Sequence, residues 1–407
     1  MYKQNFRPRR GDRNFSPGGR PSSGWRGGRN FGSRVRRQKT FDPSFIIKNL
    51  KEADSPREEE KFTPKNSFSD FNVSEKLKDN IARRGFTTPT PIQDQAIEEI
   101  LAGRDVVGIA NTGTGKTAAF LIPLIDKVVR DKAQKVLIIT PTRELAVQIE
   151  KELYSITRDL GIFSTICIGG MPIRKQIYHL NRRPHFVIGT PGRLLDLYEQ
   201  RCINFADYQT VVLDEVDRML DMGFLPDMER IIAKLPGPRQ SLFFSATITD
   251  KVRVVMNKFT ANPVTISVKT SDTLAKVKQD VVRVNGKGKV GMLIEMLYSE
   301  EFEKVLVFGR TKRGVETLSR ELVKNGFQAA SIHGNKSQNQ RQFALDQFKY
   351  GKVRVLLATD VASRGLDIDD ISHVINYDLP ETYEDYIHRI GRTGRANKAG
   401  VALTFVG

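Results

Sequence analysis

Short apolar runs, rich in β-branched residues, alternate with helix-like segments from about residue 68 to the end of the chain. The runs are residues 105–109, 136–140, 186–189, 210–213 and 241–244, then 281–284, 305–308, 353–358, 373–376 and 401–405. Runs that are apolar throughout are typical of strands buried on both faces of a parallel sheet. The rhythm pauses once, near residues 267–278. The pattern therefore predicts two successive doubly wound α/β domains.

These patterns divide the chain into four parts. Residues 1–65 are predicted to be a disordered Arg/Gly-rich tail and linker, 66–268 a first domain, 269–278 a second linker, and 279–407 a second domain. The first helix is expected to follow Ser74, because Val73, Leu77 and Ile81 have helical spacing and Ser is favoured at the N-cap. In doubly wound sheets ligands bind at the carboxyl ends of the strands, so functional residues are expected there.

Positive charge is concentrated at the N-terminus. The formal net charge is +18, and residues 1–40 contain ten Arg and two Lys against one Asp. This concentration favours a polyanionic partner, nucleic acid before acidic lipid. Arg–Gly sequence with scattered aromatic residues fits a nonspecific RNA-binding arm, since guanidinium groups and rings both stack on bases. A spacer or a targeting segment is the alternative reading, although seven glycines disfavour the amphipathic helix of a transit peptide.

Cysteine usage and hydropathy limit the compartment. The two cysteines, Cys167 and Cys202, have no CxxC spacing, which suits a reducing environment. The longest apolar run, residues 118–125, is interrupted by Pro123, whereas about 20 apolar residues are needed to span a bilayer. The basic N-terminus is not followed by the apolar stretch of a secretory signal. We therefore expect a soluble, cytoplasmic protein without a membrane partner, and a monomer.

A glycine-rich sequence, ANTGTGKT at residues 110–117, follows the predicted strand at 105–109. Glycines at such a junction let backbone N–H groups surround phosphate, with a helix N-terminus behind them. Lys116 is expected to neutralise the β- and γ-phosphates of a nucleotide, and the Thr117 hydroxyl to hold Mg²⁺. The other loop residues expected to contact the nucleotide are Thr112, Gly113, Thr114 and Gly115.

Three acidic residues lie in the sequence DEVD, residues 214–217, directly after the predicted strand at 210–213. Carboxylates at the end of a buried strand are costly to bury unless they serve a cation. Asp214 is therefore predicted to hold Mg²⁺ through water, and Glu215 to orient the attacking water.

With these motifs the chain resembles the DEAD-box RNA helicases of superfamily 2, from roughly residue 68 to the C-terminus. The alanine that opens the P-loop matches the family's form, AxTGxGKT, while Val216 stands where the family usually has Ala. Further motifs occur in the expected order at residues 85–93 (GFTTPTPIQ), 141–145 (PTREL), 169–170 (GG), 190–193 (TPGR), 245–247 (SAT), 307–311 (VFGRT), 338–341 (QNQR), 364–367 (RGLD) and 388–395 (HRIGRTGR). The resemblance implies two RecA-like domains and an ATP-dependent RNA helicase. The family usually adds a helix after the last strand, so the second domain is expected to be truncated here.

The resemblance also implies roles around the nucleotide. Gln93 would read the adenine edge with its amide while Phe68 packs on the base, so ATP rather than GTP is expected. Arg392 and Arg395 resemble arginine fingers that stabilise charge on the γ-phosphate, and Asp367 is placed near the ribose. The residues implied in coupling ATP to RNA are Asp217, Ser245, Thr247 and His388.

RNA is the implied partner, bound as single strands and short duplexes without sequence preference. The side chains involved suit phosphate and 2′-hydroxyl groups, which position RNA without reading bases. They are Arg143, Gly170, Thr190 and Arg193 in the first domain, and Arg310, Gln338, Arg341 and Thr359 in the second. The helix after TPGR is expected to bend one strand, so unwinding would be local and ATP hydrolysis would release the RNA.

Two other functions remain open. A superfamily 2 DNA helicase would share the motifs at residues 307–310 and 388–395, but the GFTTPTPIQ and PTREL motifs together with Asp217 favour RNA. A nonenzymatic RNA clamp would bind ATP and seldom turn it over, but Glu215, Arg392 and Arg395 favour hydrolysis.

Overall fold

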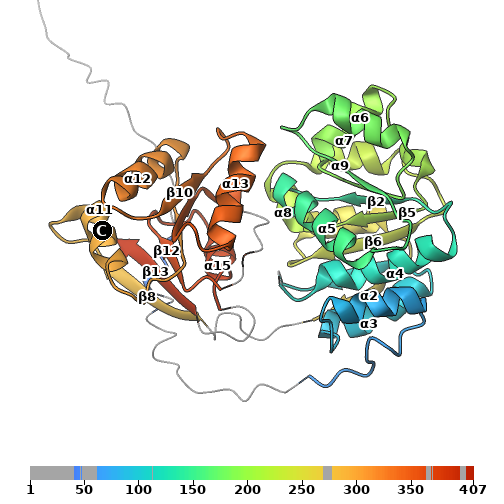
Figure 1. Ribbon diagram of the computed structural model, residues 1–407, viewed down its shortest axis with the longest axis horizontal. Helices are drawn as coiled ribbons and strands as arrows, with labels where there is room; N and C mark the ends of the chain where they lie inside the picture. The colour runs from blue at the N-terminus through green and yellow to red at the C-terminus, as the bar shows by residue number, and fades with distance from the viewer. Residues whose placement is uncertain are drawn as a thin grey trace, which may run out of the picture. The chain divides into compact units, whose positions relative to one another are not determined.

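The computed structural model describes residues 41–45, 47, 62–111, 113–268, 277–363, 368, 370–394 and 400–407. It contains two parallel sheets with helices packed against them (Figure 1). Residues 1–40 and most of 46–61, predicted to be disordered, lie outside the described residues, as do linker residues 269–276. Strand β8 begins at Val277, so residues 277 and 278 belong to the second sheet and not to the linker. The reason is that β8 pairs along its whole length with a seven-residue neighbour.

The first sheet has seven strands in the order β3-β4-β2-β5-β6-β1-β7, and every neighbouring pair is parallel. Its strands are β1 (Val106–Ile109), β2 (Val136–Ile139), β3 (Ser164–Cys167), β4 (Phe186–Gly189), β5 (Thr210–Leu213), β6 (Gln240–Ser245) and β7 (Val264–Ser267). Its helices are α2 (Glu75–Arg83), α3 (Pro91–Leu101), α4 (Lys116–Arg130), α5 (Arg143–Ile156), α6 (Ile173–Asn181), α7 (Pro191–Glu199), the 3₁₀ helix η1 (Phe205–Asp207), α8 (Val216–Asp221), α9 (Leu225–Ile232) and α10 (Asp250–Phe259).

Both faces of the first sheet are buried, which explains the continuous apolar runs in its strands. Successive strand residues belong to opposite cores: Val106 and Ile138 lie in one, and Val107 and Leu137 in the other. Helices α2 to α5 supply the first core, and α6 to α10 supply the second. Because side chains alternate along a strand, a strand covered on both sides needs apolar residues at every position.

The second sheet has six parallel strands in the order β10-β11-β9-β12-β13-β8. Its strands are β8 (Val277–Arg283), β9 (Val305–Phe308), β10 (Ala329–Ile332), β11 (Val355–Ala358), β12 (His373–Asn376) and β13 (Gly400–Val406). Its helices are α11 (Gly288–Leu297), α12 (Lys312–Lys324), α13 (Gln338–Lys349), α14 (Asp360–Ser363) and α15 (Tyr383–Ile390). The prediction of two doubly wound domains is confirmed.

Residues 41–45 and 47 lie inside the stretch predicted to be disordered, yet they pack on the second domain. The Phe41 ring lies 5.6 Å from that of Tyr383 and 6.1 Å from that of Tyr386, and Ile47 is 2% exposed. The Phe41 N–H donates to the Pro380 carbonyl at 2.9 Å. These two apolar side chains give the short segment enough buried surface to order it, so the prediction of disorder is wrong there.

The first predicted helix begins where expected, at Glu75 with Ser74 as its N-cap, but the Ser74 side chain makes no capping hydrogen bond. The Ser74 N–H instead donates to Asp126 Oδ1 at 2.7 Å. In the described part of the chain, we find no helix whose length and hydrophobicity would allow it to cross a membrane.

Candidate functional site

The P-loop joins the carboxyl end of β1 to α4. Gly113 and Gly115 have φ angles of +85° and +89°, and Gly115 is the N-cap of α4. These left-handed conformations favour glycine and leave the helix N-terminus bare of side chains, as an anion site requires. Lys116 is 7% exposed, and its Nζ donates to the Ala110 carbonyl at 2.6 Å. Thr112 lies outside the described residues.

Asp214 lies at the end of β5 and is 2% exposed. Burial raises the pKa of its carboxyl to about 7, the Lys116 ammonium opposes that rise, and the Glu215 charge adds to it. Its carboxylate accepts a hydrogen bond from the Glu215 N–H at 2.9 Å. A buried carboxylate with so little compensation is suited to a cation, which would stabilise its charged form.

The residues present fit Mg²⁺ bound mostly through water and phosphate oxygens. Among the described residues no group of three or more His, Cys, Asp or Glu side chains could hold a metal by itself. Mg²⁺ characteristically uses one or two protein ligands together with substrate phosphates and water. Asp214 and the half-buried Thr117, in the first turn of α4, match that requirement.

Glu215 occupies the N-cap of α8 with φ +51°. Its Oε2 accepts a hydrogen bond from Arg218 Nη1 at 2.6 Å, and the two side chains are 6% and 3% exposed. The carboxylate predicted to orient water is therefore engaged by a buried cation one turn later in the same helix. No role was predicted for Arg218 from the sequence.

Asp217 connects the carboxyl ends of two neighbouring strands, β5 and β6. Its Oδ2 accepts from the Ala246 N–H at 3.0 Å, the Thr247 N–H at 2.9 Å and the Thr247 hydroxyl at 3.1 Å. The Ser245 hydroxyl in turn donates to the Thr247 carbonyl at 2.8 Å. The structure thus brings together three of the four residues predicted to couple ATP to RNA.

Gln93 lies at the start of α3, against the P-loop. Its Oε1 accepts from the Thr90 N–H at 2.9 Å, which closes a capping box, and its Nε2 donates to the Gly115 carbonyl at 3.1 Å. A Cβ at position 115 would collide with this amide. Gln93 therefore holds the helix against the P-loop, and an adenine contact would require its amide to exchange partners.

Phe68 is 7% exposed and belongs to the core of the first domain. Its ring stacks on Phe86 at 5.8 Å and meets Phe71 edge-on at 6.1 Å. The segment before it is held by Asp94, whose carboxylate accepts from the backbone N–H groups of residues 65 and 66 at 3.0 Å each and from Asn66 Nδ2 at 3.1 Å. Asp94 thereby fixes the approach of Phe68 to the start of α3.

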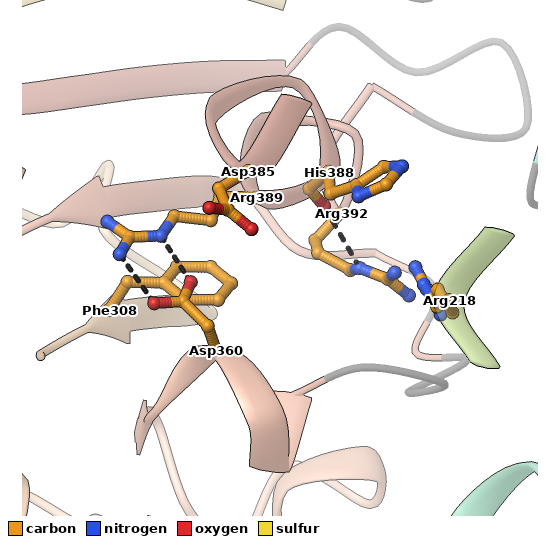
Figure 2. A pocket seen from close by; sticks show the side chains of 7 residues that line it. All are labelled: Arg218, Phe308, Asp360, Asp385, His388, Arg389 and Arg392. Carbon is orange, nitrogen blue, oxygen red and sulfur yellow. Dashed lines mark hydrogen bonds and ion pairs between the residues drawn. The ribbon is translucent and has the colours of Figure 1, made fainter. Parts of the chain in front are cut away.

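In the second domain, Arg389 on α15 and Arg392 in the turn after it are buried, and both line a pocket (Figure 2). Arg389 makes a bidentate ion pair with Asp360, at 2.5 and 2.7 Å, and its guanidinium lies over the Phe308 ring. Arg392 is 3% exposed, and its Nε donates to the His388 carbonyl at 3.3 Å. These residues line a pocket together with Asp385 and with Arg218 from α8. Arg395 and Asp367 lie outside the described residues.

The predicted RNA contacts of the first domain gather at the ends of β3 and β4. The Arg143 guanidinium lies against Gly169 and Gly170, and a Cβ at Gly170, where φ is +79°, would collide with it. Arg193 Nη1 donates to the Met171 carbonyl at 3.4 Å, and its Nε lies 3.3 Å from Asp196. Burial, with a contribution from Arg341, lowers the pKa of Arg143. Thr190, the N-cap of α7, is buried.

Two predicted RNA residues of the second domain share one acidic partner. Gln338 Nε2 donates to Glu144 Oε1 at 3.0 Å, and Arg341 Nη2 lies 3.0 Å from the same oxygen. Thr359 is buried at the end of β11, whereas Arg310 is exposed and donates to the Leu379 carbonyl. The structure thus brings Arg143, Gln338 and Arg341 together, and it places Arg310 and Thr359 on other strand ends.

Four buried charged residues that organise these sites were not predicted from the sequence: Asp94, Glu144, Arg218 and Arg389. Each lies within or beside a recognised motif. A signal was therefore available, since charged residues are seldom fully buried without a partner. The partner itself could not be read from the sequence.

A P-loop, a strand-end acidic cluster and a second parallel sheet with buried arginines define a two-domain nucleotide-binding protein with RecA-like folds. Residues 90–255 match the family model of DEAD/DEAH box helicases, and residues 288–397 match that of the helicase conserved C-terminal domain. The chain belongs to the family of DEAD-box ATP-dependent RNA helicases.

Its curated relatives include proteins named ATP-dependent RNA helicase CshA. It is 46% identical to that of Listeria monocytogenes over 83% of this chain and 66% of the relative. It is 45% identical to that of Bacillus licheniformis over 84% of this chain and 70% of the relative. The chain thus spans about two thirds of the length of these relatives.

Solved structures with the same fold include helicases bound to RNA. S. cerevisiae Dbp5 bound to RNA and ADP BeF3 is 31% identical, with a TM-score of 0.75 over 84% of this chain and 89% of that chain. Mss116p bound to ssRNA and AMP-PNP is 29% identical, with a TM-score of 0.76 over 86% of this chain and 76% of that chain. These likenesses confirm the predicted fold class.

Proposed function

We propose that the chain is an ATP-dependent RNA helicase that locally unwinds RNA duplexes or remodels RNA–protein complexes. The main support for the proposal is the set of hydrogen bonds that Asp217 accepts from Ala246 and Thr247. These bonds connect the end of β5 to the end of β6. A movement of the acidic cluster on nucleotide binding would pass directly to the second strand end. The named relatives and the RNA-bound neighbours support the same function.

ATP would bind at the P-loop, with phosphates at the N-terminus of α4. Lys116 would exchange its bond to the Ala110 carbonyl for the β- and γ-phosphates. Gln93 would exchange its internal partners for the adenine edge, with Phe68 nearby. Asp367 is proposed to lie near the ribose. The loop contacts proposed from the sequence are Thr112, Gly113, Thr114 and Gly115.

Thr117 and Asp214 would hold Mg²⁺, Asp214 through water. The ion, when bound, supplies positive charge to the transferring phosphoryl group. Glu215 would orient the attacking water after giving up Arg218, and Arg392 and Arg395 would stabilise the developing charge.

RNA would bind through its backbone at the ends of β3 and β4 and on the second domain. Arg143 would hold phosphate over Gly169 and Gly170, where the absence of side chains leaves room for a strand. The other contacts proposed are Thr190, Arg193, Arg310, Gln338, Arg341 and Thr359.

The test is phosphate release with and without RNA, together with unwinding of matched RNA and DNA duplexes. We expect ATP hydrolysis that rises with RNA and unwinding of RNA only. Glu215→Gln keeps the shape of the side chain, so it should bind ATP and RNA together yet hydrolyse about 10² to 10⁴ times more slowly. Hydrolysis indifferent to RNA, or equal unwinding of DNA, would overturn the proposal.

A further inference from the structure

The chain between Leu160 and Leu195 contains no Asp or Glu, although 47 of the 407 residues are acidic. It contains five cations: Arg174, Lys175, Arg182, Arg183 and Arg193. Four of the five lie on α6 or directly after it, and only Arg193 was assigned to a motif. The helix and the residues after it are therefore positively charged, and the proposed function gives these four cations no role.

Two of these cations flank an exposed aromatic residue on the outer face of α6. Arg174, Tyr178 and Arg182 are spaced by four residues, which places them in one row along a helix, and all three are exposed. Tyr178 is 63% exposed. The opposite face is buried through Gln176 and Leu180. We call Arg174, Tyr178 and Arg182 the α6 row.

The α6 row is fixed relative to the proposed RNA contacts. Gln176 Nε2 donates to the carbonyls of Ile168 at 2.9 Å and Met171 at 3.3 Å, the residues on either side of the glycine pair. Arg193 also donates to the Met171 carbonyl. A strand that crosses Gly170 therefore has the α6 row next to it along the same chain segment.

The cations of the α6 row have no acidic partner among the described residues. Other exposed cations of the first domain do have one: Arg230 lies 2.6 Å from Glu199, and Lys258 lies 2.6 Å from Glu229. A guanidinium without a carboxylate is available to phosphate. Interleaved cations and rings are the arrangement that binds single-stranded nucleic acid.

The second residue after α6 is an arginine at a position where the backbone favours glycine. Arg183 has φ +51°, a left-handed conformation that follows many helices and is usually taken by Gly or Asn. It also precedes a proline, which disfavours helical backbone for the residue before it. Arginine here is unfavourable for the fold, which suggests that its side chain serves a different purpose.

We propose that the α6 row and Arg183 bind single-stranded RNA that extends beyond the glycine pair, through phosphates on the arginines and a base on Tyr178. This inference rests on the proposed function and extends its RNA interface. The nine residues of α6 cover about 13 Å, which corresponds to about four nucleotides of stacked strand.

The first experiment measures affinity of the full chain for single-stranded RNA over a series of lengths and salt concentrations. Affinity should rise with RNA length until the RNA fills the binding surface. For Arg174→Gln combined with Arg182→Gln, this plateau should be reached with RNA about four nucleotides shorter than for the unchanged protein. Its log–log salt slope on long RNA should fall by up to about 1.4, or 0.7 for each lost phosphate contact. ATP hydrolysis at saturating RNA should be unchanged. The matched control, Lys349→Gln combined with Lys352→Gln, removes the same charge at the C-terminal end of α13 and should leave the length plateau unchanged.

Two single variants separate folding from binding. Glycine adopts the left-handed conformation without steric cost, so Arg183→Gly should not lower the melting temperature. It should nevertheless weaken binding of long RNA, because the arginine side chain is lost. Tyr178→Ala should weaken binding of long RNA about tenfold, and Tyr178→Phe should restore it, because either ring stacks on a base.

The outcomes distinguish this inference from the proposed function. If the unchanged protein binds no RNA, the proposed function fails. If it binds RNA with RNA-stimulated hydrolysis, but the α6 variants match it in plateau and slope, only the α6 inference fails. An equal loss in the control pair would assign the effect to net charge and would also overturn it. Binding of an acidic peptide, but not of RNA, to the α6 row would also overturn the α6 inference.

Discussion

The two domains shift the pKa of a carboxylate near a strand end in opposite directions. In the first domain, burial raises the pKa of Asp214 to about 7, against the opposing charge of Lys116. In the second, hydrogen bonds lower the pKa of Glu316 to about 2: the Ser331 hydroxyl contributes most, burial opposes it, and His333 and Lys336 add to it. The Ser331 bond is 2.6 Å and the His333 contact 3.1 Å.

This difference separates a ligand site from a structural cluster. Asp214 is short of partners, so its ionised form opposes folding and favours a cation. Glu316 is surrounded by donors from β10 and the loop before α13, so its ionised form stabilises the fold. Asp360, which Arg389 holds by two bonds, resembles Glu316 in this respect. The uncompensated burial of Asp214 therefore indicates a cation site, whereas the donors around Glu316 and Asp360 indicate structural ion pairs.

The largest expected effect is on hydrolysis. Asp214→Asn keeps the shape of the side chain but removes the charge that would serve Mg²⁺, so phosphate release should fall by about 10² to 10³. Because the pKa of Asp214 is raised, its charge disfavours the folded state at pH 7, and the variant should unfold at no lower urea concentration. If Asp214→Asn lowered stability but kept activity, Asp214 would be a structural group and not part of a ligand site.

Asp217 tests whether a fully bonded carboxylate in the first domain can also be functional. Asp217→Asn cannot accept all the hydrogen bonds that reach Oδ2, so unfolding free energy should fall by about 1–3 kcal/mol. Unwinding per ATP hydrolysed should fall more than hydrolysis itself, since the link to β6 is weakened. Equal losses in the two assays would show that the link is structural only.

A smaller effect is expected from Asp94, which lies next to Gln93 and holds residues 65 and 66. Asp94→Asn loses one acceptor, so Phe68 should be held less firmly and the KM for ATP should rise, with kcat little changed. Gln93→Ala is the comparison: it should reduce the preference for ATP over GTP, a contact worth about 1–3 kcal/mol. The idea fails if Asp94→Asn lowers kcat and leaves KM as it was.

The smallest effect on activity is expected at Glu316. Glu316→Gln loses charge-assisted bonds, so unfolding free energy should fall by about 1–2 kcal/mol while RNA-stimulated hydrolysis stays normal. Because the folded pKa lies near 2, below the usual 4.5, this contribution is complete above pH 4.5 and disappears as pH falls towards 2. Urea unfolding of both proteins at pH 7 and pH 3 measures it, and a constant difference would contradict the assignment.

The central strands and the motifs could be predicted from local sequence patterns. Ten predicted strands are present, among them β4, β5, β9 and β12 with the predicted bounds. Their neighbours cover both edges and helices cover both faces, so most of their residues are apolar and the signal is local. The three missed strands, β3, β7 and β10, all lie at sheet edges. Edge strands are only partly covered and contain exposed or half-buried positions, so their sequences lack a continuous apolar run.

Which charged groups meet depends on the tertiary packing. The P-loop was readable because its backbone geometry requires glycines at fixed spacing. The hydrogen-bond partners of Gln93, Asp94 and Glu316 lie on other segments. In these bonds the two residues are separated by 15 to 29 positions in the sequence. No local pattern specifies such pairs, because they depend on how strands and helices pack. The sequence thus located the chemistry, and the fold decided which buried charges are compensated and which await a ligand.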